Sequence, residues 1–469
     1  MKFTPPGLAA VGYDLTPPFV VDVSLDPVGD LSAQRQTELR FITVARVLPG
    51  RRVSGLAEHE GRTVFAKLFY GKRALHYWQR ELRGARRMAH AQITTPGLLA
   101  QGASADGSGF VVFYEALEDV HNLRDDDIED VLAATQILAR LHDANLIQSD
   151  VHIFNFLRCL GNYFAIDADG IRSAYLPRQH FRNLAMFLAQ RRPVFDRDVD
   201  EVWSVYSASR GAYVSRMGST ALVAKLIRQQ RRQRVRRYLK KTQRECTEFV
   251  RHRSWRHNFL CDRAHWQRLQ RFMLFAEDMM AEGIPLKLGN SSTVVRIEVA
   301  GHGYVVKRYN LKSSWHRIRR LFKRRARDAW RNGHHLAFLG VDTAKPVALL
   351  ETKWGWLTGV CYLVMPDVGS QDLGQVLAAQ PEAFDRYAGK TVGLLENLAA
   401  AGLRHGDLKA TNFVLAHDRV VLIDYDAVQA GSLDKDVTRF LRNWQDVPDL
   451  HHQWSMALAP LQVYLEGNR

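Results

Sequence analysis

A set of three polar residues occurs twice in this chain with the same spacing, and this repeat limits the possible folds more than any other feature. In the first half of the chain the set is Asp150, Asn155 and Asp167. In the second half it is Asp407, Asn412 and Asp424. In both sets the Asn lies five residues after the first Asp, and the second Asp lies twelve residues after the Asn. A repeat on this scale predicts two copies of one fold.

The elements expected around the two sets also follow one order. Residues 62–69 and 303–309 are typical of strands, and each strand carries one lysine, Lys67 or Lys307, among apolar residues. Apolar residues at helical spacing predict a helix before each acidic loop, at 131–142 and 391–401. The chain has 469 residues, and one hydrophobic core rarely serves more than about 250 to 300. We therefore expect an N-terminal domain over 1–235, a basic linker or helix over 236–259, and a C-terminal domain over 260–469.

These residue types at this spacing suit phosphoryl transfer. That reaction needs a lysine on the nucleotide phosphates, divalent ions that bridge them, and a carboxylate that orients the acceptor hydroxyl. In the C-terminal copy we assign Asp407 to the acceptor and Lys409 to the transferring phosphoryl group. Asn412 and Asp424 are the expected Mg²⁺ ligands, because Mg²⁺ prefers hard oxygen atoms, and Lys307 is expected to contact ATP.

A candidate phosphate lid precedes the second strand lysine. Gly289 and Ser291 lie in a short polar turn between apolar segments, although the turn lacks a full glycine triplet. In the N-terminal copy the corresponding predictions are Asp150 as catalytic residue, Asn155 and Asp167 as metal ligands, and Lys67 as cofactor-binding residue. The fold class expected from both copies is α+β, with two tandem protein-kinase-like bilobal domains.

Both copies resemble the lipopolysaccharide core kinase family, which includes the bacterial Kdo and heptose kinases and has a protein-kinase-like fold, and the resemblance covers most of both halves of the chain. The strongest similarity is the run His405-Gly406-Asp407-Leu408-Lys409-Ala410-Thr411-Asn412-Phe413, and a second similarity extends from Arg325 to Thr343. The resemblance implies a cytoplasmic, ATP- and Mg²⁺-dependent kinase at the inner face of the inner membrane. Its acceptor would be a sugar hydroxyl, on heptose or Kdo, of the nascent lipopolysaccharide core.

Each copy departs from the family pattern at a different point. Relatives pair the strand lysine with a helical Glu, and the N-terminal copy supplies Glu81 as that partner of Lys67, whereas Ala329 stands at this position in the C-terminal copy. Gln148 and Ser149 replace the usual His-Gly pair before Asp150. The better loop favours the C-terminal copy as the active one.

Two alternative functions stay open. A protein kinase would use the same residues, but no Ala-Pro-Glu signature follows the segment from Asp424 to Asp436. A noncatalytic scaffold, in which both folds bind glycolipid or partners, would explain the departures at Ala329 and Gln148. Magnesium-dependent nucleotide binding would count against the scaffold.

The chain is basic, with 65 Lys and Arg against 49 Asp and Glu and a net charge of +16. Two stretches, 228–241 and 315–327, combine basic residues with a partial apolar stripe, which is typical of helices on an anionic membrane surface. Such a helix can equally pack its stripe on its own domain. Nucleic acid is not expected as a partner, because no helix-turn-helix, zinc-finger or RNA-platform signature accompanies the charge. Four scattered cysteines predict neither disulfides nor zinc, and fit a cytoplasmic protein.

Overall fold

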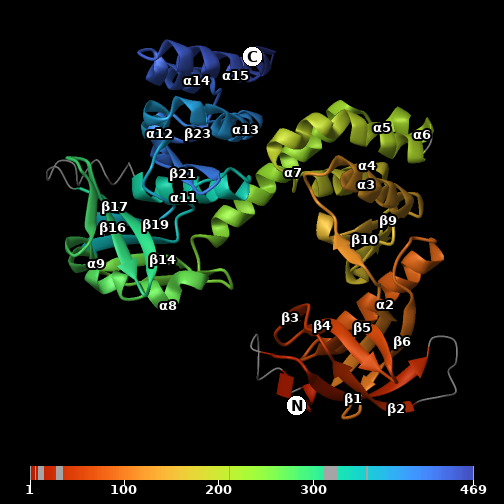
Figure 1. Cartoon of the computed structure of the whole chain (residues 1–469). Coiled ribbons are helices and arrows are strands. Elements are labelled where there is room, and N and C mark those ends of the chain that lie inside the picture. The colour runs from red at the N-terminus through yellow and green to blue at the C-terminus, as the bar shows by residue number, and fades with distance from the viewer. Residues whose placement is uncertain are drawn as a thin grey trace. The chain divides into compact units, whose positions relative to one another are not determined.

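The computed structural model describes the chain at residues 2–5, 7–8, 15–27, 35–210, 212–310, 325–354 and 357–467. Internal contacts divide the chain into two compact units (Figure 1). The N-terminal unit comprises Met1–Arg191 and Arg197–Gln230, and the C-terminal unit comprises Arg192–Asp196 and Arg231–Arg469.

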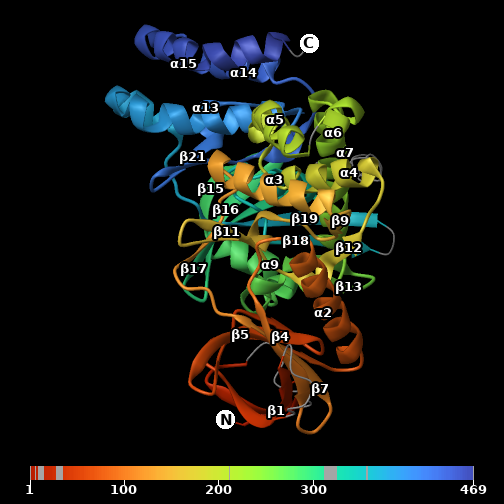
Figure 2. The ribbon, with the colours of Figure 1, turned by 90° about the vertical axis from the view of Figure 1, so that its right-hand side faces the viewer.

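The N-terminal unit begins with a seven-stranded antiparallel sheet in the order β2-β1-β6-β7-β5-β4-β3. The strands are β1 (Phe19–Pro27), β2 (Arg35–Phe41), β3 (Arg46–Leu48), β4 (Arg52–His59), β5 (Arg62–Tyr70), β6 (Leu98–Ser104) and β7 (Gly109–Glu115). Strand β2 also pairs with β4, so six of the strands close into a barrel-like sheet (Figures 1 and 2). Phe19, Val21 and Val23 alternate with half-buried residues along β1, and their side chains fill the interior with Phe41 and Phe113.

The rest of the N-terminal unit is mainly helical. Helix α2 (Ala74–His90) lies beside the sheet, and a second core gathers around α3 (Ile128–Asp143) and α4 (Pro177–Leu188). The remaining elements are the short strands β8 (Val120–Asn122), β9 (Leu146–Gln148), β10 (Phe156–Cys159), β11 (Asn162–Ala165) and β12 (Ile171–Ser173), and the helices α5 (Val199–Arg210) and α6 (Ala212–Met217). This unit therefore combines a barrel-like sheet with a helical part, and the closure of the barrel was not anticipated from the sequence.

The C-terminal unit also begins with a seven-stranded antiparallel sheet, in the order β13-β14-β18-β19-β17-β16-β15. Its strands are β13 (Phe249–Arg253), β14 (His257–Asp262), β15 (Ile284–Leu288), β16 (Ser292–Val299), β17 (His302–Tyr309), β18 (Ala348–Trp354) and β19 (Leu357–Pro366). The helices α8 (Trp266–Leu269) and α9 (Phe272–Ala281) cover one side through buried residues such as Phe272, and α11 (Arg325–Phe338) contributes Trp330 to a separate core.

The helical part of the C-terminal unit holds its largest core. The helices are α12 (Leu373–Ala379), α13 (Phe384–Ala400), α14 (Asp434–Leu441) and α15 (Pro448–Gly467), and the strands are β20 (Leu403–Arg404), β21 (Phe413–Ala416), β22 (Arg419–Leu422) and β23 (Gln429–Ala430). Phe384 and Phe440 make edge-to-face contacts with Trp454, which ties α13 and α14 to α15. Mixed helical and strand content, as expected from the sequence, thus holds for both units.

The predicted linker region contains regular structure. Helix α7 (Thr220–Lys241) is continuous, and the change of unit falls within it, between Gln230 and Arg231. Residues 249–259 form β13 and the start of β14, because Phe249 and Phe259 are buried in the C-terminal unit. In the structure, only 242–248 and the turn at 254–256 of the expected linker lie outside helices and strands.

The basic stretches differ in what can be said of them. In α7 the apolar residues pack on the protein: Ile227 is fully buried in the N-terminal unit, and Leu239 is buried in the C-terminal unit. The basic residues of this helix could therefore attract anions, but its apolar stripe is not available to a membrane. Residues 315–324 of the second stretch lie outside the described residues. No helix in the described ranges has both the length and the apolar composition that a membrane span requires.

Candidate active site

A short hairpin explains the repeated spacing. In the C-terminal unit Asn412 directly precedes β21, β21 pairs with β22, and Asp424 follows β22 after one residue. The backbone N–H of Ile423 donates to the carbonyl of Asn412 at 2.9 Å, so the hairpin brings both predicted metal ligands to its open end. The N-terminal unit repeats this arrangement with β10 and β11, where Ile166 donates to Asn155 at 2.8 Å. The twelve-residue interval is thus the length of one hairpin.

The loop before the C-terminal hairpin presents Asp407. One carboxylate oxygen of Asp407 accepts from Lys409 at 2.9 Å, and the other accepts from Arg439 of α14 at 2.9 Å. The Asn412 side-chain amide donates to the Asp407 carbonyl at 2.7 Å, which leaves the amide oxygen of Asn412 as its free acceptor. The Asp407 side chain is 40% exposed, so it is both oriented and accessible.

The strand lysine of the C-terminal unit pairs with two carboxylates of one segment. Lys307 is buried, and its ammonium lies 2.6 Å from Asp424 and 3.1 Å from Asp426. The Tyr309 hydroxyl donates to Asp426 at 2.9 Å, and Arg325 lies 3.3 Å from the same carboxylate. Asp426 was not among the predicted site residues, yet its carboxylate pairs with Lys307 and holds the ammonium group in position.

Electrostatics keep Asp424 charged. Burial alone would raise the pKa of Asp424, but the charge and hydrogen bond of Lys307 outweigh this effect, and the pKa is lowered. Burial raises the pKa of Tyr309 well above its usual value, and the nearby Asp426 charge adds to this. Tyr309 therefore stays a donor, and Asp424 stays an anion at neutral pH, as a metal ligand must be.

Ala329 of α11 holds the place that Glu81 has in α2. Each of the two helices is followed by a residue with a left-handed backbone conformation, and these residues give a common reference point. They are Gln92 after α2 and Gly340 after α11. Counting back eleven residues from each gives Glu81 and Ala329, and both are fully buried. The C-terminal unit therefore lacks a carboxylate on this helical position, and Asp426 supplies one from the loop instead.

The predicted lid lies next to the lysine strand. Gly289 and Ser291 form the turn between β15 and β16. The backbone N–H of Asn310, directly after β17, donates to the Ser291 carbonyl at 3.1 Å, and its side chain donates to the Gly289 carbonyl at 2.9 Å. The turn is therefore fixed to the end of the strand that carries Lys307.

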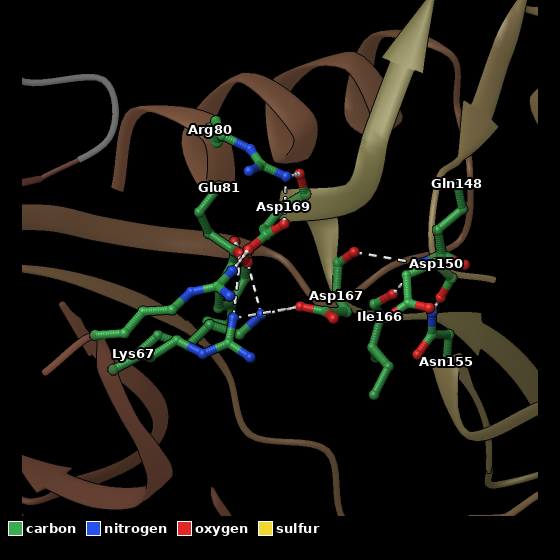
Figure 3. Close-up of polar contacts among 12 residues, drawn as sticks. Lys67, Arg80, Glu81, Gln148, Asp150, Asn155, Ile166, Asp167 and Asp169 are labelled. Carbon is green, nitrogen blue, oxygen red and sulfur yellow. Dashed lines mark hydrogen bonds and ion pairs between the residues drawn. The ribbon is translucent and has the colours of Figure 1, made fainter. Parts of the chain in front are cut away.

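The same positions in the N-terminal unit form a tighter ion cluster (Figure 3). Lys67 lies 2.6 Å from Glu81, as predicted, and 3.4 Å from Asp167. The buried Arg52 lies 3.4 Å from Asp167 and 3.9 Å from Glu81, and the Tyr114 hydroxyl donates to Glu81 at 2.7 Å. Burial raises the pKa of Asp167, but the charges and hydrogen bonds of Lys67 and Arg52 lower it to about 2.

Two arginines lie at the β3–β4 turn of the N-terminal unit. In the strand order this turn corresponds to the β15–β16 turn, the predicted lid of the C-terminal unit. Arg51 and Arg52 end the β3–β4 turn, and Arg51 lies 2.7 Å from Asp169, which also pairs with Arg80 of α2 at 2.9 Å (Figure 3). In this unit, protein cations thus pair with both carboxylates that follow the hairpin, Asp167 and Asp169.

Gln148 makes the hydrogen bond in the N-terminal unit that His405 makes at the same position of the C-terminal unit. His405 donates from Nε2 to the Ile423 carbonyl at 3.2 Å, and burial lowers its pKa, so it is neutral. Gln148 donates from its amide to the equivalent Ile166 carbonyl at 2.9 Å (Figure 3). Gly406 needs to be glycine, since its φ is +85° and an added Cβ would lie 2.8 Å from the Ala427 carbonyl oxygen. The N-terminal loop therefore differs in sequence at Gln148 but keeps the hydrogen bond to the carbonyl after its second strand.

The oxygen donors of the C-terminal unit fit a magnesium ion. Among the described residues no group of three or more His, Cys, Asp or Glu side chains is arranged to hold a metal. Mg²⁺ in phosphoryl-transfer sites takes one or two protein carboxylates, keeps waters and uses substrate phosphates as ligands. The carboxylate of Asp424 with the amide oxygen of Asn412 matches that limited donor set.

The comparisons with known proteins agree with this geometry. Residues 286–458 match the model of the lipopolysaccharide kinase (Kdo/WaaP) family, a span that includes Lys307, Asp407, Asn412 and Asp424 and is less than half of the chain. The match identifies the C-terminal unit as a phosphotransferase domain of the kinase class. Over the N-terminal unit the resemblance stays a prediction.

Two curated kinases are similar over part of the chain. The serine/threonine-protein kinase MPS1 of Saccharomyces cerevisiae is 31% identical over 155 residues, which is 30% of this chain and 20% of that kinase. The B1 kinase of Variola virus is 26% identical over 132 residues, covering 26% of this chain and 43% of the viral protein. The chain therefore spans less than half the length of either relative.

Solved structures show weaker similarity. WaaP in complex with acyl carrier protein is 20% identical with a TM-score of 0.31, and the alignment covers 40% of this chain and 88% of that one. Aminoglycoside phosphotransferase APH(4)-Ia is 12% identical with a TM-score of 0.31, covering 42% and 84%. Both TM-scores are below 0.5, so neither structure bears on what this chain does.

Sequence reasoning missed several residues of the two sites. One signal was present: Asp169 and Asp426 both lie two residues after the predicted metal ligand, so Asp-x-Asp is itself repeated. Asp436 of α14 accepts from the backbone N–H groups of His405 and Gly406, and no local pattern marks it. Arg439 and Arg52 likewise reach their carboxylates only through the fold.

Proposed function

We propose that the chain is an ATP- and Mg²⁺-dependent kinase, with its catalytic centre in the C-terminal unit, that phosphorylates a heptose or Kdo hydroxyl of the lipopolysaccharide core. The observation that carries the proposal is that the family match over 286–458 contains Lys307, Asp407, Asn412 and Asp424, which the fold brings into two linked clusters. Work at the cytoplasmic face of the inner membrane, where that acceptor is made, belongs to the same proposal.

The proposed roles follow from the contacts. Asp407 orients the acceptor hydroxyl and takes its proton, because its carboxylate is exposed and held by Arg439 and Lys409. Lys409 also faces the phosphoryl group in transfer. Lys307, held by Asp426, contacts the nucleotide phosphates, and the Gly289–Ser291 turn covers them.

Asp424 and Asn412 are the proposed Mg²⁺ ligands, and the bound ion would neutralise charge on the phosphates. Lys307 lies 2.6 Å from Asp424 and favours the ionised carboxylate, which is the form that binds a metal ion. In the N-terminal unit the proposed counterparts are Asp150, Asn155, Asp167, Lys67 and Glu81. There Asp150 is exposed, but Asp167 is already neutralised by Lys67 and Arg52, which favours a supporting role for that unit.

A protein kinase is the second candidate. The local similarity to MPS1, at 31% identity, is the observation that favours it. The chemistry at Asp407 would be the same, and only the acceptor would differ.

The test is transfer of the terminal phosphate of ATP, with magnesium, to isolated lipopolysaccharide core and in parallel to a general protein substrate. We expect transfer to the core acceptor, and an approximately 1,000-fold loss in Asp407→Ala, the scale of a positioned general base. Asp150→Ala is the matched control, since Asp150 has the same place in its own loop, and it should retain wild-type transfer.

The other outcomes are equally informative. Transfer to protein alone would replace the proposed acceptor with that of the second candidate. Transfer that survives Asp407→Ala would remove Asp407 from the mechanism, and transfer lost in Asp150→Ala would place catalysis in the N-terminal unit.

A further inference from the structure

A basic cavity lies on the N-terminal unit beside α2. Its volume is about 280 Å³, and its walls come from one face of the helix and from the segment around β12. The charged and polar residues that line it are His76, Arg80, Arg83, Arg87, Asp169 and Arg172.

The helix presents these side chains because of their spacing. His76, Arg80, Arg83 and Arg87 are separated by four, three and four residues, which places them on one face of an α-helix. The wall opposite is held close by Gly84, where an added Cβ would lie 1.8 Å from the Ala168 carbonyl oxygen. The cavity is thus bounded by a packed contact between two elements.

The positive charges of the cavity are not neutralised by the protein. Arg80 pairs with Asp169, but that carboxylate is shared with Arg51. Within the described residues no carboxylate lies at ion-pair distance from Arg83, Arg87 or Arg172, whose side chains are exposed. Arg83 donates from Nε to the backbone carbonyl of Gln79 at 3.3 Å, which is a neutral acceptor. Three like charges around one small cavity repel each other unless an anion joins them.

We propose that this cavity binds a compact ligand carrying phosphate groups. Guanidinium groups present paired N–H donors that match phosphate oxygens, so several arginines around one cavity favour phosphate over a single carboxylate. The scarcity of apolar lining, with Ile171 as the exception, disfavours an aromatic or aliphatic ligand. The volume is near the lower limit for small-molecule sites, which fits a diphosphate or a sugar phosphate.

The site is separate from the proposed catalytic centre, which lies in the other unit. Lys67, Glu81 and Asp167 of the neighbouring ion cluster do not line the cavity, whereas Arg80 and Asp169, which pair with each other beside that cluster, do (Figure 3). The proposal therefore stands or falls independently of the kinase assignment.

The first measurement is calorimetric titration of the full chain with inorganic pyrophosphate, in EDTA and without magnesium. The variant Arg83→Gln/Arg87→Gln should weaken binding by about 10- to 100-fold, the scale of losing charge-assisted hydrogen bonds. The control Arg86→Gln/Arg182→Gln removes the same charge from exposed positions outside the cavity, one of them on the same helix, and should change affinity less than about twofold.

The second measurement distinguishes a soluble source of phosphate from a lipid source. Sedimentation with vesicles of phosphatidylcholine, with and without phosphatidic acid, is compared for wild type and both variants. A loss specific to Arg83→Gln/Arg87→Gln in either assay supports the site and names its source. Equal weakening by the control, or no binding in both assays, would overturn the proposal. Arg172→Gln, from the opposite wall, must give the same loss and guards against a folding defect of α2.

Discussion

The two units hold their strand lysine in place by different means. In the N-terminal unit Lys67 pairs with Glu81 from helix α2, and Arg52 adds a second cation, so two cations and two carboxylates neutralise one another. In the C-terminal unit Lys307 pairs with Asp424 and Asp426, which both follow the hairpin. Ala329 of α11 offers no carboxylate, yet Lys307 has two carboxylate partners.

This difference also separates what each site can bind. Asp167 lies between Lys67 and Arg52, and its side chain is 32% exposed. Asp424 contacts one cation, and its side chain is 40% exposed. A carboxylate with two protein cations gains less from a metal ion, because its charge is already compensated. The N-terminal site has the helical carboxylate of Glu81 for its lysine, but its Asp167 is less open to a metal ion than Asp424 is.

The largest expected contrast is between Asp424→Asn and Asp167→Asn. Asp424→Asn removes the charged metal ligand of the proposed catalytic centre, and transfer should fall by about 1,000-fold, or roughly 4 kcal/mol. Asp167→Asn removes the same charge from the N-terminal unit and should leave transfer within about twofold of wild type. Steady-state transfer at several magnesium concentrations measures both, and equal losses would make the two units equivalent.

The next contrast concerns stability. Glu81 is fully buried between Lys67 and Tyr114, so Glu81→Gln leaves the two buried cations, Lys67 and Arg52, with Asp167 as their one carboxylate. Breaking a buried pair in this way should lower the unfolding free energy of the N-terminal unit by about 3 kcal/mol. Hydrogen exchange of peptides from α2 and β5 reports that unit alone.

The exposed Glu115→Gln on β7 serves as the control for Glu81→Gln and should change protection little. A Glu81→Gln protein with unchanged protection would contradict the account of the cluster as a structural unit. Loss of transfer without loss of protection would instead show that Glu81 acts in catalysis.

A smaller effect is expected at the carboxylate that anchors Lys307. Asp426→Asn keeps the shape but weakens the hold on Lys307, and transfer should fall about 10- to 100-fold with a rise in KM for ATP, as for other residues that orient a ligand. A merely structural role would lower kcat and stability without affecting KM. Asp169→Asn, at the same place in the N-terminal unit, should leave KM unchanged.

The sequence predicted the local parts of both sites better than the distant ones. The spacing of Asn412 and Asp424 is set by one hairpin, and Lys307 lies on a strand that its own alternation predicts, so both could be found from nearby residues. The pairing of β2 with β4, which closes the barrel, joins strands whose sequences carry no mark of each other. Arg52 is distant in sequence from its partner Asp167, and Arg439 is distant from its partner Asp407. These pairs form only when the whole unit has folded, so no local pattern predicts them.

The smallest expected effect is the loss, at acidic pH, of the stability that the Asp167 charge gives the N-terminal unit. The pKa of Asp167 is about 2 in the folded protein, against about 3.9 for an unperturbed Asp, so the unfolded chain binds the proton first as the pH falls. The contribution of Asp167 to stability is therefore complete above about pH 4 and is lost between about pH 4 and pH 2, and it amounts to about 1 to 2 kcal/mol after screening. Pepsin cleavage within the N-terminal unit should be faster in Asp167→Asn than in wild type at pH 4, and this difference should vanish by about pH 2. The exposed Asp119→Asn should match wild type throughout, and a difference that persists at pH 2 would show that Asp167 stabilises the unit through hydrogen bonds that Asn does not reproduce rather than through its charge.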